Sequence, residues 1–207
     1  MIQNLKSNIT PTFCPGCNNF VLYAAIQQAI TQLQIPKKDV VLVFDIGCVG
    51  NMADFFSTYG IHSLHGRSIA TAMGVKMANP KLTVIAIGGD GGVYGEGFNH
   101  LFSAARYNLD ITVLVANNQL YSLTTGQTSP TTPQGSKTKS TPLGAPSFAL
   151  NPVKVLQSVN PKIDVKSVDG TELPEITSAI KSAITNPEFS LIDIRQTCVT
   201  FGKQLKS

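Results

Sequence analysis

The sequence has no tryptophan, only four glutamates and few charged residues of either sign. Charged residues make up 14% of its 207 residues and hydrophobic residues 43%, which is typical of a well-buried globular protein or a subunit of a larger assembly. The net charge of +4 is spread along the chain without a basic run interleaved with aromatics, so nothing indicates nucleic acid. No apolar run approaches the roughly 18 residues of a membrane span, and residues 1–12 lack a signal-peptide pattern. We therefore expect a cytoplasmic protein without a membrane partner.

Apolar runs of strand length alternate with segments of helical periodicity, which predicts an α/β fold with a mostly parallel sheet. The predicted strands are 40–44, 82–87, 111–116, 162–168 and 190–195, and the predicted helices are 18–33, 68–78, 96–107, 152–159 and 173–184. This alternation shows no boundary and no repeat, so we expect one doubly wound domain over residues 1–207.

Polar residues follow two of these strands. Asp90 stands in the run 88–92, Gly-Gly-Asp-Gly-Gly, after one strand, and Asn117-Asn118 follows the next. In a β-α-β unit both strand ends lie on the carboxyl edge of the sheet, where ligands bind, so Asp90 and Asn118 are expected side by side. A carboxylate and an amide oxygen suit Mg²⁺ with ligand phosphates, and the glycines let a diphosphate approach the backbone.

This pattern resembles the thiamine diphosphate signature, in which an Asp, an Asn and a backbone carbonyl hold Mg²⁺ on the cofactor's diphosphate. The resemblance implies Asp90, Asn118 and the carbonyl of Leu120 as metal ligands. The alternative is a turn aspartate beside an Asn-rich loop without a cofactor.

The four cysteines form another pattern. Cys14 and Cys17 lie in a Cys-Pro-Gly-Cys turn, whereas Cys48 and Cys198 follow the predicted strands 40–44 and 190–195. In a reducing compartment this favours metal binding or redox chemistry over disulfides, and the CxxC alone suits zinc, iron-sulfur or redox exchange equally. The parallel sheet can bring the two lone cysteines to the CxxC turn.

Taken together, the segments FCPGC, DIGC, HGRS, GGDGG, VANN, TTGQTSPTTPQG and TCVTFG resemble the β subunits of 2-oxoacid:ferredoxin oxidoreductases from about Phe13 to Gly202. The resemblance implies a [4Fe-4S] cluster on Cys14, Cys17, Cys48 and Cys198, with a structural Cys₄ zinc site as the alternative. It also implies a thiamine diphosphate site formed by Gly16, Ile46, Gly47, Cys48, Val49, His65, Gly66, Arg67, Ser68, Asp90, Gly91, Gly92, Asn118, Ser122 and Leu123.

The His-Gly-Arg turn before the helix 68–78 can donate hydrogen bonds to a diphosphate or to a substrate carboxylate. We therefore predict His65 and Arg67 as catalytic residues. Residues 122–152 lack regularity and are rich in Thr, Pro and Gly; structureless loops of this length tend to be active-site lids, so we expect a lid with Ser122 and Leu123 near the cofactor. Lys137 and Lys139 are expected to be solvated, with an acidic ferredoxin or CoA as the alternative partner.

A thiamine enzyme needs a glutamate on the pyrimidine side of the cofactor. The four glutamates of this chain lie in no second domain of the nucleotide-binding type, so the pyrimidine half must come from another polypeptide. The glutamates are Glu96, Glu172, Glu175 and Glu188. In the family that the sequence resembles, an α subunit supplies this half and helps to bind CoA.

The implied activity is oxidative decarboxylation of a 2-oxo acid to acyl-CoA and CO₂, with electrons passing through the cluster to ferredoxin. Asn51 stands where relatives that use 2-oxoglutarate carry a basic residue, which favours pyruvate or another monocarboxylate. The run 126–130, Gly-Gln-Thr-Ser-Pro, resembles the 2-oxoglutarate and branched-chain types and points the other way. The alternatives are a non-oxidative 2-oxoacid decarboxylase subunit and a non-catalytic scaffold stabilised by zinc.

Overall fold

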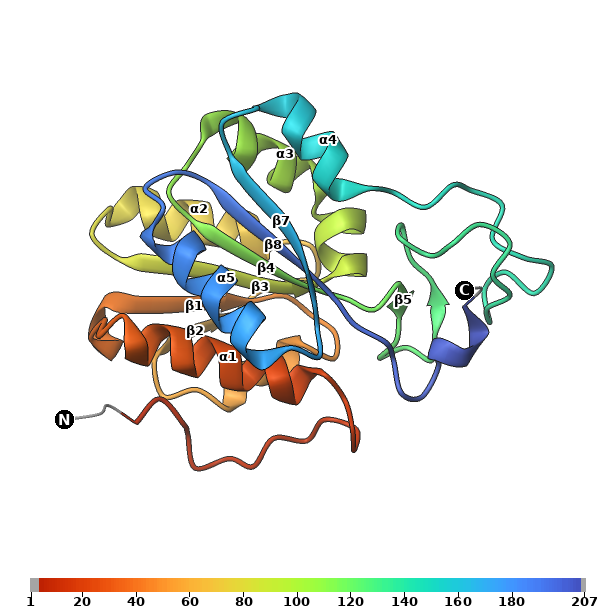
Figure 1. Cartoon of the computed structure of the whole chain (residues 1–207), viewed down its shortest axis with the longest axis horizontal. Coiled ribbons are helices and arrows are strands. Elements are labelled where there is room, and N and C mark those ends of the chain that lie inside the picture. The colour runs from red at the N-terminus through yellow and green to blue at the C-terminus, as the bar shows by residue number, and fades with distance from the viewer. Residues whose placement is uncertain (1–3, 206–207) are drawn as a thin grey trace.

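The computed structural model describes residues 4–205, and its centre is one six-stranded sheet in which all pairings are parallel (Figure 1). The strand order is β2-β1-β3-β4-β8-β7. The strands are β1 (Val40–Phe44), β2 (Tyr59–His62), β3 (Thr83–Gly89), β4 (Thr112–Asn117), β7 (Asp164–Asp169) and β8 (Ser190–Arg195). Chain order reverses between β1 and β3, and this is where a doubly wound sheet opens a crevice for ligands. The predicted fold class is confirmed.

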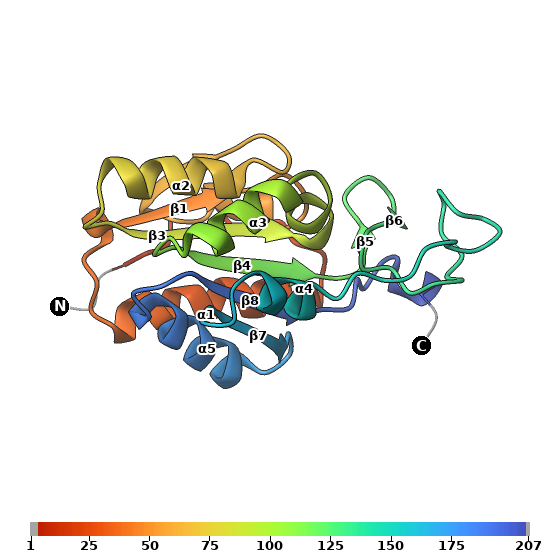
Figure 2. The ribbon, with the colours of Figure 1, turned by 90° about the horizontal axis from the view of Figure 1, so that it is seen from above.

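Helices cover both faces of the sheet (Figure 2). One face carries α1 (Asn19–Gln32) and α5 (Leu173–Thr185). The other carries α2 (Ser68–Ala78), α3 (Phe98–Tyr107) and α4 (Pro152–Val159). Every residue of β1 and β4 is buried between these layers, which explains why both strands are continuously apolar in sequence. Short turns are η1 (Lys37–Asp39), η2 (Gly50–Asp54) and η4 (Gly202–Gln204).

The structure differs from the sequence-based elements at two places. The helix predicted from Glu96 begins at Phe98, because residues 91–96 form a π-helical turn, η3, that Gly97 N closes with a 2.7 Å hydrogen bond to Gly92 O. Strand β2 was not predicted, because its four residues are exposed along the sheet edge and form no apolar run. It nevertheless pairs in parallel with β1.

Residues 122–151 extend beyond the carboxyl edge of the sheet (Figures 1 and 2). Within this extension the only ladder among the described residues is a short antiparallel pair, β5 (Leu120–Tyr121) with β6 (Gln127–Thr128). The extension packs on the C-terminal segment, since a Cβ built on Gly126 would lie 2.9 Å from Phe201 Cβ. Across residues 4–205, the structure contains no helix long and apolar enough to cross a membrane.

Candidate active site

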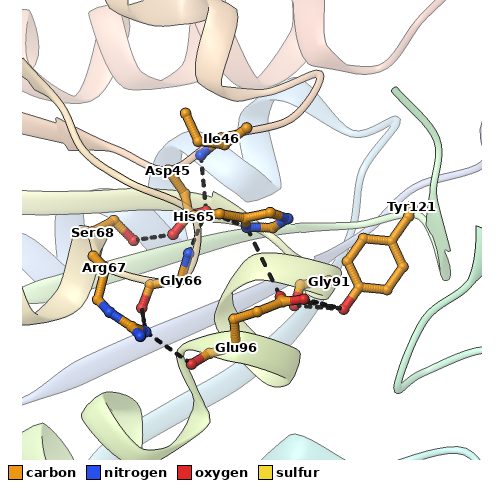
Figure 3. A network of polar contacts seen from close by, with 9 residues as sticks. All are labelled: Asp45, Ile46, His65, Gly66, Arg67, Ser68, Gly91, Glu96 and Tyr121. Atoms are coloured by element: carbon orange, nitrogen blue, oxygen red, sulfur yellow. Dashed lines mark hydrogen bonds and ion pairs between the residues drawn. The ribbon is translucent and has the colours of Figure 1, made fainter. Parts of the chain in front are cut away.

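A buried carboxylate at the end of β1 organises the first part of the site (Figure 3). Asp45 is fully buried, and its Oδ1 accepts hydrogen bonds from Ile46 N at 2.8 Å, Gly66 N at 3.0 Å and His65 Nδ1 at 3.1 Å. Its Oδ2 accepts one from Ser68 Oγ at 2.9 Å. When Asp45 is ionised it can only accept, and a proton on His65 Nδ1 then completes this contact and leaves Nε2 as an acceptor. Asp45 therefore holds the His65 ring in position.

The arginine of the His-Gly-Arg turn bonds to backbone carbonyls. Its Nη1 donates to the carbonyls of Gly66 at 3.3 Å and Glu96 at 3.1 Å, so Arg67 ties the turn to η3 and presents those donors to backbone, not to a ligand. The Glu96 carboxylate accepts from the Tyr121 hydroxyl at 3.1 and 3.3 Å and lies 3.9 Å from His65 Nδ1 (Figure 3). Partial burial, together with the Glu96 charge, raises the pKa of Tyr121.

The glycine-rich turn after β3 admits no side chain at two positions. A Cβ on Gly91 would overlap the Tyr121 ring, and a Cβ on Gly92 would overlap Asp45 Oδ1. Tyr121 and Asp45 therefore pack directly against the backbone of this turn, where Gly91 and Gly92 are buried.

The structure brings Asp90 and Asn118 together as predicted. Asp90 is 1% exposed, and its Oδ1 accepts from Asn118 N at 3.3 Å. Asn118 Oδ1 accepts from Leu120 N at 3.1 Å and from Ser122 Oγ at 3.0 Å, so Ser122 also lies at the site. Burial raises the pKa of Asp90 to about 6, and hydrogen bonds, including one from Thr131, only partly offset this effect. A buried carboxylate of this kind favours a cation beside it.

Sequence reasoning missed a polar network behind Asp90. The Thr131 hydroxyl lies 2.9 Å from both Asp90 Oδ2 and Asn117 Oδ1. Asn117 Nδ2 donates to Asp193 Oδ1 at 3.0 Å, and the Tyr94 hydroxyl donates to the same oxygen at 2.8 Å. Thr131, Asn117 and Asp193 also line a cavity of about 930 Å³ between α4 and the ends of β7 and β8. Strand-end position marks Asp45 and Asn117 in the sequence, whereas Asp193 lies inside β8 and no sequence signal links Thr131 to Asp90.

The four cysteines meet at the same edge of the molecule. The charges of Cys198, Cys17 and Cys14 act on Cys48 and, after burial, help to raise its pKa to about 11. Burial likewise raises the pKa of Cys17, with contributions from Cys14 and Cys198. A Cβ on Gly16, in the CxxC turn, would lie 3.9 Å from Val199 Cγ1, directly after Cys198. All four thiols are free and lie within electrostatic reach of one another.

Two donor sets at this edge have the chemistry of metal ligands. Thiolates suit soft metals and iron-sulfur clusters, and the oxygens of Asp90 and Asn118 suit Mg²⁺. Within residues 4–205, no three or more His, Cys, Asp or Glu side chains are arranged closely enough to hold a single metal ion. The oxygen set contains only one such carboxylate, so ligand phosphates and water would complete it.

The remaining predicted residues lie around these two sets. Gly47 adopts φ +117° in the loop before Cys48, a conformation that favours glycine, and Val49 is 2% exposed. Leu123 is 52% exposed at the start of the extension.

The fold and this edge define a class of protein. Residues 45–194 match the family model described as thiamine pyrophosphate enzyme, C-terminal TPP binding domain, so the chain is a thiamine diphosphate-enzyme domain. Its relatives include the 2-oxoacid:ferredoxin oxidoreductase β subunits of Saccharolobus solfataricus, 44% identical over 92% of this chain, and Aeropyrum pernix, 38% identical over 97%. The chain belongs to the family of 2-oxoacid:ferredoxin oxidoreductase β subunits.

The fold agrees with this assignment. The 2-oxoglutarate:ferredoxin oxidoreductase of Magnetococcus marinus, whose structure holds 2-oxoglutarate, coenzyme A and succinyl-CoA, superposes with a TM-score of 0.91 at 31% identity. The match covers 95% of this chain and 67% of that one. The chain spans 63% of the length of both the Saccharolobus and the Aeropyrum relatives.

Proposed function

We propose that the chain is the catalytic β subunit of a 2-oxoacid:ferredoxin oxidoreductase, which converts a 2-oxo acid and CoA to acyl-CoA and CO₂ and passes the electrons to ferredoxin. The observation that carries the proposal is the meeting of two donor sets at one sheet edge. The buried carboxylate of Asp90 and the half-buried side chain of Asn118 lie at the ends of β3 and β4, and four free thiols gather beside the ends of β1 and β8.

In this proposal Asp90, Asn118 and the carbonyl of Leu120 hold Mg²⁺ on the diphosphate of thiamine diphosphate. The glycines at 91 and 92 allow Tyr121 and Asp45 to pack against the turn that follows Asp90. The bound cofactor supplies the carbanion chemistry of decarboxylation. The protein fixes the cofactor's position and excludes water around it.

Among the side chains near the glycine turn, His65 is the proton-transfer group of this proposal. Asp45 Oδ1 lies 3.1 Å from His65 Nδ1, and with the ring proton on Nδ1 the Nε2 atom can accept a proton and return it. Arg67 acts as a positioning residue, because it joins the His65 turn to the carbonyl of Glu96.

Cys14, Cys17, Cys48 and Cys198 hold a [4Fe-4S] cluster in this proposal. Iron-sulfur centres pass one electron at a time, which suits ferredoxin as the acceptor. Because burial raises the pKa of Cys48 to about 11 and also raises that of Cys17, binding of a cluster would release protons from these two thiols.

A partner subunit completes the site. The Glu96 carboxylate is engaged with Tyr121 and His65 on the diphosphate side, so it supports the view that the pyrimidine-side glutamate comes from an α subunit. We further propose a single domain over residues 1–207, with residues 122–152 as a lid. The four free thiols fit a reducing cytoplasm.

The substrate is proposed as a 2-oxo monocarboxylate. Asn51, in η2 beside the Cys48 loop, offers no positive charge for a second substrate carboxylate. The similarity to a structure that holds 2-oxoglutarate favours the dicarboxylate instead, so the assay must include both classes.

The test is an anaerobic assay of the chain co-purified with its α subunit. Pyruvate, 2-oxoglutarate, branched-chain and aryl 2-oxo acids are supplied with CoA, and ferredoxin reduction is followed. We expect CoA-dependent reduction with at least one 2-oxo acid, and none when Asp90→Asn replaces the wild-type chain. CO₂ and aldehyde release without reduced ferredoxin would establish the non-oxidative decarboxylase instead. A complex that binds neither thiamine diphosphate nor iron would indicate a scaffold.

A further inference from the structure

One hydroxyl from the extension reaches into the predicted Mg²⁺ site. Thr131 is 3% exposed, and its Oγ1 lies 2.9 Å from Asp90 Oδ2, 41 residues away in the sequence. It also lies 2.9 Å from Asn117 Oδ1. A hydroxyl carries one proton, so it can donate to only one of these two acceptors at a time.

The second acceptor has a fixed orientation. Asn117 Nδ2 donates to Asp193 Oδ1 at 3.0 Å, which turns Asn117 Oδ1 toward Thr131. Asp193 is 4% exposed, and it is held by the Tyr94 hydroxyl at 2.8 Å and the Ser167 hydroxyl at 3.2 Å. The amide of Asn117 is therefore held in place from β8, with its Oδ1 as the second acceptor 2.9 Å from the Thr131 hydroxyl.

We propose that Thr131 is a positioning residue for the metal site: its hydroxyl donates to Asp90 Oδ2 and holds the Asp90 carboxylate in the orientation that binds Mg²⁺. The inference rests on the proposed function and assigns a role in it to a residue of the extension. Asp90 Oδ2 lies 2.9 Å from Thr131 Oγ1, and Asp90 Oδ1 accepts a longer 3.3 Å bond from Asn118 N. Ser129 adds a side-chain hydrogen bond to the same carboxylate, so Asp90 is held both from the extension and from the end of β4.

A consequence is that metal binding and the order of the extension are coupled. If docking of Thr131 strengthens Mg²⁺ binding, then Mg²⁺ must strengthen docking by the same factor. Lys137 and Lys139 are exposed on the extension and give trypsin two cleavage sites that report its order.

The neighbouring threonine provides a matched control. Thr132 is 2% exposed, and its hydroxyl bonds to Gln119 O and Ser129 N, lies 3.3 Å from Ser129 Oγ and makes no direct hydrogen bond to Asp90. Thr131→Val and Thr132→Val each remove one buried hydroxyl at nearly constant volume, but only Thr131→Val removes a bond to Asp90. Thr131→Ser keeps the hydroxyl and serves as the conservative variant.

The experiment uses the complex with the α subunit, freed of cofactor. Mg²⁺ is titrated calorimetrically at saturating thiamine diphosphate, and tryptic cleavage at Lys137 and Lys139 is timed with and without both ligands. We expect Thr131→Val to raise the Mg²⁺ concentration for half-saturation about 10- to 100-fold, as loss of an outer-shell partner does. We also expect it to abolish the protection from trypsin, whereas Thr132→Val and Thr131→Ser stay within about threefold of wild type.

Two results would overturn the inference. Equal shifts for Thr131→Val and Thr132→Val would show a general packing effect, and an unchanged Thr131→Val would show that Asp90 needs no orientation from the extension. If the wild-type complex showed no Mg²⁺-dependent binding of thiamine diphosphate, the proposed function itself would fail together with the inference.

Discussion

The oxygen set around Asp90 and the sulfur set around Cys48 share one sheet edge but differ in how the protein supports them. The Asp90 and Asn118 oxygens are held by backbone and hydroxyl donors, and Asp90 is 1% exposed. By contrast, Cys14 is exposed, the other three cysteines are half-buried, and their thiols repel one another when charged. The oxygen set is thus organised by the protein itself, whereas the sulfur set would depend on the proposed cluster for its order.

The largest effect is expected from the sulfur set. Cys48→Ser removes one of four thiolates from a set with little other support, so we expect loss of nearly all bound iron and of ferredoxin reduction. Iron and sulfide analysis of anaerobically purified protein measures this loss. Val199→Ala, which alters the residue after Cys198, should keep its iron. Retention of the whole cluster by Cys48→Ser would remove Cys48 from the ligand set.

The reciprocal change is Asp90→Asn in the oxygen set. We expect it to weaken Mg²⁺-dependent binding of thiamine diphosphate by about 100-fold, because the charged ligand is lost. Iron content should stay at the wild-type level, since the sulfur set is independently built. Calorimetry and iron analysis of one preparation test both statements. Loss of iron in this variant would contradict the division into two sets.

The charge on Asp90 should also be measurable as a stability difference. Because burial raises its pKa to about 6 in the fold, above its ordinary 3.8, the folded state binds this proton more tightly than the unfolded state. The ionised group therefore costs about 3 kcal/mol at pH 7, and the cost falls to about half of that at pH 5. In urea unfolding without Mg²⁺, Asp90→Asn should be more stable than wild type at pH 7, with a smaller gap at pH 5. A stability difference between Asp90→Asn and wild type that grows as the pH falls would contradict the raised pKa of Asp90.

Asp45 lies between the His65 turn and the start of the Cys48 loop, and it bonds to both. Asp45→Asn keeps the size but removes the charged acceptor, so we expect kcat to fall by roughly 10- to 100-fold with unchanged iron content. The pH profile of kcat should shift as well, because the Nδ1 proton of His65 loses its anionic partner. A fall in kcat without a change of pH profile would assign Asp45 a purely structural role.

The smallest effect lies in the extension. Thr125 adopts φ +81°, which is strained for a β-branched residue, so Thr125→Gly should stabilise the fold by about 1 kcal/mol. Thr124 has no positive φ, so Thr124→Gly should destabilise it through added chain entropy. Urea midpoints of the two variants give the comparison. If both variants changed the urea midpoint in the same direction, Thr125 would not be strained.

The sequence predicted the elements whose burial is uniform and the residues that end them. Continuous apolar runs identified β1, β3 and β4, and the strand-end rule placed Asp90 beside Asn118. It did not identify β2, whose residues are all exposed, because such a strand carries no hydrophobic pattern. The same strand-end rule applies to Asp45, which directly follows Phe44, although Asp45 was not predicted as a site residue.

Other features depend on contacts that no local pattern encodes. Thr131 meets Asp90 across 41 residues of irregular chain, and the turn of Arg67 toward backbone carbonyls depends on where η3 lies. The spacing of the glycines predicted a turn after β3 but not that residues 91–96 form a π-helical turn. Tertiary packing decides these details, whereas periodicity decides the layers.

The central claim is most directly tested by metal analysis of the wild-type complex purified without oxygen. The account predicts brown protein with about four iron and four sulfide per β subunit, since one Cys₄ set holds one [4Fe-4S] cluster. Colourless protein with one zinc per chain would contradict it.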